Sequence, residues 1–173
     1  ISVNENLGHY EAIDQIAIAK HYQGLPYVDA TRLAIWGWSY GGYLTSKVIE
    51  ADSGVFKVGM AVAPVTHWNL YDSMYTERYM KTPKLNPKGY DVTGVNKMEG
   101  FKKAKFLLIH GTGDDNVHFQ QSAALVNDFT MNSVTTYQVQ FYVDSDHRNT
   151  NNNAYPQLHN RLKTFLFDNF RAV

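Results

Sequence analysis

Residues 32–41 read RLAIWGWSYG, and this stretch indicates how the chain folds. Residues 32–36 form a short apolar run that stops at Gly37, a pattern typical of a buried strand. Residues 40–51 then show the apolar spacing of a helix. Ser39 is therefore predicted to stand in a sharp turn between a strand and a helix.

The same alternation of strand and helix patterns continues along the chain. Further strands are predicted at residues 57–62, 105–109 and 137–143, and further helices at residues 10–22, 119–131 and 156–170. Pro156 is compatible with the last helix because it falls in the first turn. This order favours a single α/β domain with a mostly parallel sheet flanked by helices, whose active site lies at the carboxyl ends of the strands.

Residues 66–103 depart from this pattern. The stretch is rich in tyrosine and is interrupted by Pro83, Pro87, Gly89 and Gly94. We expect loops there, with one short helix around residues 75–80. A long excursion between two strands often builds a substrate pocket.

Composition excludes several classes of function. The chain has 173 residues, with 16 basic and 16 acidic side chains and no net charge, so nothing favours nucleic acid or an anionic membrane as a partner. Because there is no cysteine, disulfides, cysteine-ligated zinc and thiol catalysis are excluded. No apolar run approaches the roughly 20 residues that span a bilayer.

The residues from Gly37 to Gly41 match the pattern G-x-S-x-G. In a strand-to-helix turn this pattern lifts the Ser39 hydroxyl above the sheet at the positive end of a helix. The two glycines are expected to let the flanking backbones pass without a Cβ clash. The backbone N–H of Tyr40 is then placed to donate to an oxyanion.

A serine nucleophile needs a base and an acid that orients the base, which follow it in the order acid and then histidine on this fold. Asp114 and Asp115 follow the third predicted strand, and spacing does not choose between them. His147 follows the fourth strand and is the predicted base. His110 is a rival base, although a buried, hydrogen-bonded structural role suits it better.

Longer motifs surround these residues: WGWSYGGY at 36–43, AVAPV at 61–65, YDS at 71–73, YTERYM at 75–80, LLIHGT at 107–112, DDNVHFQQS at 114–122 and DH at 146–147. Together they resemble the dipeptidyl peptidase IV-like members of the prolyl oligopeptidase family of serine peptidases, from about residue 11 to residue 147. The resemblance implies that residues 1–173 are the C-terminal part of an α/β-hydrolase catalytic domain. The first strands of that domain and an N-terminal β-propeller are expected to lie outside this chain.

The resemblance also implies roles for individual residues. Ser39 would be the nucleophile, His147 the base and Asp114 the acid. Asn116 would hydrogen-bond a substrate carbonyl, and Arg148 stands where the family usually has glycine. The residues implied to line the pocket for the side chain before the scissile bond are Tyr40, Val65, Trp68, Tyr71, Tyr75 and Val117. No metal or organic cofactor is implied.

The function implied is release of N-terminal X-Pro or X-Ala dipeptides from peptide substrates. Homodimers and a membrane-anchored, secreted or vacuolar location are implied by the resemblance as well. Another hydrolase on this fold, an acylaminoacyl peptidase or an esterase, is an alternative, and a non-catalytic accessory protein is a second. A third is a chain that is inactive alone, since the family's oxyanion tyrosine and amine-binding glutamates would lie outside it.

Overall fold

The computed structural model describes residues 3–171. Four strands form one parallel sheet, in which every strand lies beside its neighbours in the sequence. In sheet order they are β1 (Ala34–Trp38), β2 (Val58–Val62), β3 (Lys105–Gly111) and β4 (Tyr137–Tyr142). The predicted parallel sheet with flanking helices is confirmed.

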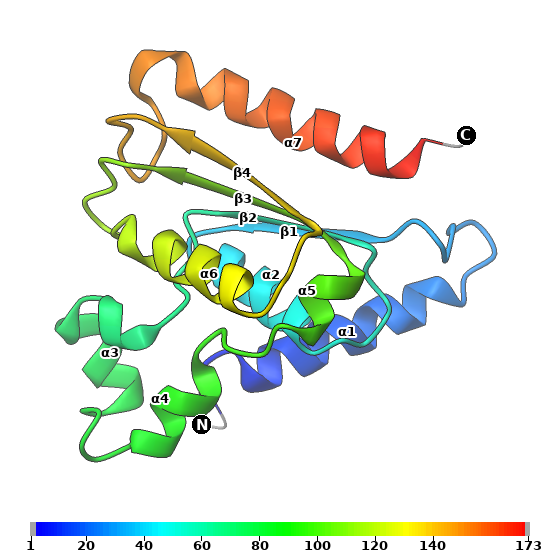
Figure 1. The fold of residues 1–173 in the computed structure, drawn as a ribbon. Coiled ribbons are helices and arrows are strands. Elements are labelled where there is room, and N and C mark those ends of the chain that lie inside the picture. The colour runs from blue at the N-terminus through cyan, green and yellow to red at the C-terminus, as the bar shows by residue number, and fades with distance from the viewer. Residues whose placement is uncertain (1–2, 172–173) are drawn as a thin grey trace.

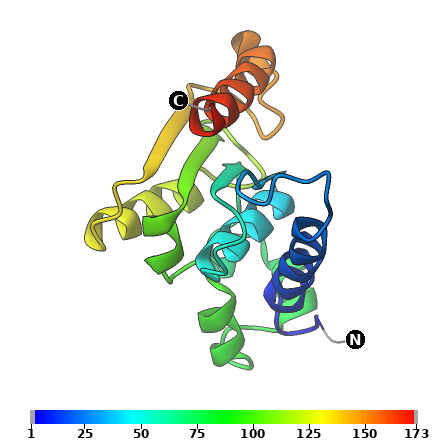
Figure 2. The same ribbon diagram turned by 90° about the vertical axis from the view of Figure 1, so that its right-hand side faces the viewer.

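The helices cover the two faces of the sheet unequally. One face carries α7 (Ala154–Phe170), which a 3-10 turn, η2 (Asn151–Asn153), precedes (Figure 1). The opposite face carries α1 (His9–Gln23), α2 (Tyr40–Glu50), α5 (Glu99–Lys103) and α6 (Gln120–Met131). Figure 2 shows the same arrangement from the side, with α7 above the strands.

Alternating residues of the central strands supply two separate cores. Met60 of β2 packs against Leu158 and Leu162 of α7 on one face. Ala61, the next residue, belongs to the larger core on the other face, which includes Phe106 of β3. Because both faces are covered, all five residues of β2 are buried, as the apolar run had predicted.

Two strands run further than predicted. Strand β1 continues through Gly37 to Trp38, and β3 continues through His110 to Gly111. Gly37 pairs with Ala61 in the ladder and therefore does not end the strand. A Cβ at Gly37 would lie 2.2 Å from the carbonyl oxygen of Gly41, so glycine is needed there because α2 passes close to the strand.

The expectation of loops and one helix in residues 66–103 was wrong. The short helix exists as α3 (Ser73–Met80), but a 3-10 turn, η1 (Trp68–Leu70), and the helices α4 (Pro87–Thr93) and α5 lie there too. Pro87 starts α4 instead of preventing it, because a residue in the first turn has no helical acceptor for an N–H. Asn86 caps the helix by accepting a hydrogen bond from the N–H of Gly89 at 3.1 Å.

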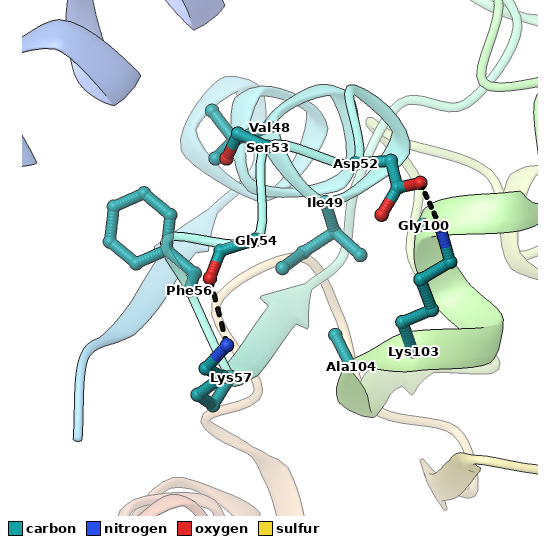
Figure 3. Close-up of a pocket in the computed structure, with 10 residues that line it drawn as sticks. All are labelled: Val48, Ile49, Asp52, Ser53, Gly54, Phe56, Lys57, Gly100, Lys103 and Ala104. Carbon is teal, nitrogen blue, oxygen red and sulfur yellow. Dashed lines mark hydrogen bonds and ion pairs between the residues drawn. The ribbon is translucent and has the colours of Figure 1, made fainter. Parts of the chain in front are cut away.

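A small hollow of about 140 Å³ lies at the amino ends of the strands, opposite the edge where Ser39 stands (Figure 3). Asp52 and Lys103 form an ion pair beside it, and the Lys57 amine donates to the carbonyl of Gly54. Among residues 3–171, no helix combines the length and apolar character needed to cross a membrane.

Candidate active site

Ser39 stands at the junction of β1 and α2 with a strained backbone. Its φ of 59° and ψ of −120° lie outside the usual regions for a residue with a side chain. The Ser39 N–H donates to the carbonyl of Val62 at 2.8 Å, and the N–H of Tyr43 donates to the carbonyl of Ser39 at 3.0 Å. The turn is therefore held by β2 on one side and by α2 on the other.

The two glycines of the turn are not equivalent. A Cβ at Gly37 would meet the backbone of Gly41, whereas a Cβ at Gly41 would have no atom within 4 Å. The expectation that both glycines avoid a clash is thus wrong for Gly41. Only Gly37 has to be glycine for the turn to form, because a Cβ at this position would collide with the backbone of Gly41.

Asp114 and His147, which follow β3 and β4, meet at the carboxyl edge of the sheet. His147 Nδ1 lies 2.7 Å from Asp114 Oδ2. Asp115, which the spacing left as an equal candidate, is exposed to solvent, whereas Asp114 is buried. The geometry therefore pairs the histidine with the first of the two aspartates.

The surroundings of Asp114 favour its ionised form. Burial acts to raise the pKa of the carboxyl group, but hydrogen bonds from His110, His147 and the backbone N–H of Asn116 outweigh it and hold the pKa well below its usual range. Oδ1 accepts from the N–H groups of Asn116 at 3.0 Å and Val117 at 2.8 Å. An ionised Asp114 fixes the His147 tautomer with the proton on Nδ1, which leaves Nε2 free to act as a base.

His110 is fully buried and both of its ring nitrogens have partners. Nδ1 lies 2.7 Å from the Ser122 hydroxyl and Nε2 lies 2.8 Å from the Val117 carbonyl oxygen. His110 is therefore a buried, hydrogen-bonded core residue, as the sequence had favoured. It does not face the hollow that holds Ser39, where a base would have to lie.

Ser39 and His147 line the same open hollow, of about 450 Å³. Its other lining residues are Trp38, Arg148, Thr150 and Tyr155. Trp38 Nε1 donates to the carbonyl of His147 at 3.1 Å, so the residue next to the nucleophile also holds the loop that carries the base. Sequence reasoning missed Trp38, although its place beside Ser39 was a usable signal. No local pattern marked Thr150 or Tyr155.

Tyr40 is held in place by a hydrogen bond to α1, a helix that the sequence had not linked to the site. Its N–H lies in the first turn of α2, where no preceding helical carbonyl can accept it. Its hydroxyl donates to Glu11 of α1 at 2.7 Å. Burial and the neighbouring Glu11 carboxylate raise the pKa of Tyr40 well above its ordinary value, so the phenol stays neutral.

Four of the predicted pocket residues form a continuous aromatic cluster. Trp68 stacks on Tyr75 with ring centroids 5.9 Å apart, and it lies 6.0 Å from each of Tyr40 and Tyr71. Val65 and Val117 are buried in the same hydrophobic core. The exposed Asn116 accepts a hydrogen bond from the Tyr71 hydroxyl at 2.8 Å.

The aromatic cluster and the open hollow are separate features. None of the predicted pocket residues lines the hollow that holds Ser39 and His147. Ser39 is flanked in the chain by Trp38, which lines the hollow, and by Tyr40, which packs in the cluster. Within residues 3–171, no group of three or more histidine, aspartate or glutamate side chains is placed to hold a metal ion.

Comparison with known proteins gives consistent matches over the whole chain. A family model described as the prolyl oligopeptidase family matches residues 2–172. The chain is 54% identical over 172 residues to the probable dipeptidyl-aminopeptidase B of Uncinocarpus reesii and 52% identical over 172 residues to that of Emericella nidulans. Each of these alignments covers 98% of this chain and 19% of the relative, so the chain spans about a fifth of their length.

Two solved structures have the same fold. Dipeptidyl peptidase 4 of Porphyromonas gingivalis superimposes with a TM-score of 0.91 and 40% identity, covering 98% of this chain and 24% of that one. A putative dipeptidyl aminopeptidase IV of Bacteroides ovatus gives a TM-score of 0.87 and 30% identity, covering 97% and 24%.

Proposed function

Because the chain belongs to the prolyl oligopeptidase family of serine peptidases, we propose that it carries the catalytic centre of a dipeptidyl peptidase. The family membership and the α/β-hydrolase fold that the sequence motifs predicted are confirmed by the match over residues 2–172 and by the structural neighbours. The observation that carries the proposed activity is the 2.7 Å contact between His147 and Asp114 in a site where His147 shares a hollow with Ser39.

In the proposed reaction Ser39 attacks the carbonyl carbon of the scissile peptide bond. His147 takes the Ser39 proton at Nε2 and then gives it to the leaving amine. Asp114 stays ionised and stabilises the positive charge on the imidazole during this step. Water then attacks the acyl-enzyme with His147 as base, which releases the acid product and restores the serine.

The Tyr40 N–H is proposed to stabilise the oxyanion of each tetrahedral intermediate. Its position in the first turn of a helix supports this role, because the backbone donors there have no helical partners and the helix end is positive. A donor aimed at developing charge contributes about 3–4 kcal/mol to catalysis in well-studied acyl-transfer sites.

The preferred substrates are proposed to be peptides with proline or alanine in the second position. A prolyl ring is compact and apolar and carries no N–H, so the partly exposed rings of Tyr40, Tyr71 and Tyr75, which pack against the buried Trp68, suit it. Asn116 is proposed to donate its amide group to a substrate carbonyl, since its side-chain oxygen already accepts from Tyr71.

The larger context remains a proposal as well. The match covers only 19% of the curated relatives, and residues 1–173 are proposed to form the C-terminal part of a catalytic domain, as the resemblance of the motifs implies. A homodimer is proposed from family membership. The relatives reported above are named as dipeptidyl peptidases, so the alternatives of an acylaminoacyl peptidase, an esterase or an accessory protein are not favoured.

Two measurements test the proposal. A fluorophosphonate should label the chain at Ser39, with the site of labelling mapped by mass spectrometry, and Ser39→Ala should remove the label. In the longer protein that contains this sequence, a Gly-Pro substrate should be cleaved at least about tenfold faster than a Gly-Leu substrate with the same leaving group, because leucine does not fit a compact ring pocket. Equal rates for the two substrates would refute the proline pocket.

A further inference from the structure

His110 connects three parts of the site without facing solvent. It lies on β3 and is 0% exposed. The strand leads directly into residues 114–117, which carry the acid Asp114 at one end and the pocket residue Val117 at the other. Ser122, which contacts the other side of the His110 ring, belongs to α6.

The neighbours of the ring determine where its proton lies. Nε2 is 2.8 Å from the carbonyl oxygen of Val117, and a carbonyl can only accept a hydrogen bond. Nε2 must therefore carry the proton. The same nitrogen is 3.2 Å from Asp114 Oδ2, the oxygen that also receives His147, so the carboxylate lies beside the carbonyl within reach of this N–H.

We propose that His110 is a positioning residue, whose Nε2–H holds Asp114 Oδ2 toward His147 and ties it to the Val117 carbonyl. This inference rests on the proposed function, because it matters for catalysis only if Asp114 orients a working base. His110 itself touches neither the nucleophile nor the hollow.

The donors around Asp114 explain why this second contact matters. Oδ1 is fixed by two backbone N–H groups, from Asn116 and Val117. Oδ2 receives only His147 and His110 among the contacts of the described residues, and His147 is partly exposed. Without His110 the orientation of Oδ2 would depend on one partly exposed partner, and the buried carbonyl of Val117 would lose its donor.

Ser122 completes the arrangement from the other side. Its hydroxyl lies 2.7 Å from Nδ1, and a hydroxyl can donate to the unprotonated nitrogen of a neutral ring. The ring is therefore held at both nitrogens, which fixes its rotation. The same ring joins the acid of the triad to the backbone of a predicted pocket wall, so the catalytic and substrate-binding parts are linked.

A matched pair of variants separates positioning from packing. In His110→Gln the amide nitrogen can reach the place of Nε2 and donate to both Val117 and Asp114, whereas in His110→Asn the shorter amide mimics Nδ1 and cannot. Fluorophosphonate labelling of Ser39 should be within about threefold of wild type in His110→Gln and about 10- to 100-fold slower in His110→Asn. The proton NMR signal of His147 Nδ1–H should persist in the first variant and be lost or displaced in the second.

If His110 only fills space in the core, Ser39 should be labelled at the same rate in both variants and the His147 signal should be unchanged. Either result would overturn the inference. Nitrogen-15 NMR of the wild-type histidines provides a measurement that needs no variant: an Nδ1–H tautomer at His110 would also overturn it. If wild-type Ser39 is not labelled in the longer protein that contains this sequence, the proposed function fails. The tautomer and the His147 signal would still decide whether His110 holds Asp114.

Discussion

Asp114 shows how much one buried carboxylate can depend on its partners. It is nearly inaccessible to solvent, and an isolated carboxylate in such a place would take up a proton. Here backbone and imidazole donors surround both of its oxygens and keep the pKa low. The stability of the fold should therefore depend on the ionisation of this group.

We predict that Asp114→Asn changes the pH dependence of unfolding. Because the folded-state pKa is lowered relative to the unfolded chain, the ionised group stabilises the fold above the unfolded pKa of about 4, and this contribution is lost as pH falls toward the folded pKa. Urea titrations at a series of pH values should show the largest difference between wild type and variant near neutrality. A difference that stays constant down to pH 2 would contradict the assignment.

At the scale of elements, the junction of β1 and α2 combines strain at Ser39 with a close approach at Gly37. The helix begins directly after the strained serine, so its first turn must pass close to the strand it has just left. The contact point is the backbone of Gly41, which cannot move aside without unwinding the helix start. The strand residue at this point therefore has to be glycine.

We predict opposite outcomes for alanine at the two glycines of the turn. Gly37→Ala should lower the free energy of unfolding by at least about 2 kcal/mol, because the new methyl group would overlap the Gly41 backbone. Gly41→Ala should be neutral or stabilise by up to about 1 kcal/mol, because its methyl group meets no atom and alanine favours helix. Chemical denaturation of both variants checks this, and equal losses would show that the close approach is wrongly located.

At the scale of the whole molecule, a buried ion pair attaches the long excursion between β2 and β3 to the body of the fold. Lys47 and Glu50 of α2 pair with each other, and both are nearly buried. The Lys47 amine also donates to the carbonyls of Val92 and Gly94, and Glu50 Oε1 accepts from the N–H groups of Asn96 and Lys97. The pair therefore holds the end of α4 against α2, the helix that follows Ser39.

We predict that Glu50→Ala lowers the free energy of unfolding by about 3–5 kcal/mol, because it leaves the Lys47 charge buried without its partner. Glu99→Ala is the matched control, since Glu99 forms an exposed pair with Lys102 that should contribute less than about 1 kcal/mol. Thermal or urea unfolding of the two variants measures the difference. Similar small losses in both would show that the buried pair does not fasten the excursion.

Most of the strands and helices could be predicted from the sequence, because each of them is encoded by the pattern of neighbouring residues. The sequence placed every strand to within two residues at each end. The central strands β2 and β3 were identified as apolar runs, since strands covered on both faces are apolar throughout. The helix α4 was missed because Pro87 and Gly89 are breakers inside a helix but not in its capped first turn. Whether Pro87 and Gly89 break a helix or begin one depends on the residue at which the helix starts, and composition does not give that residue.

The sequence by itself determined the α/β order, the family and Ser39 as candidate nucleophile, because periodicity and a strand-to-helix turn are written in neighbouring residues. Spacing could not choose between Asp114 and Asp115, which are adjacent in one loop and chemically identical; the family resemblance implied Asp114, and the tertiary structure shows His147 in contact with it. The tertiary structure alone placed Glu11 against Tyr40 and brought Tyr155 into the hollow with Ser39. These contacts join segments far apart in the chain, and their geometry depends on how the helices pack on the sheet and not on any local pattern.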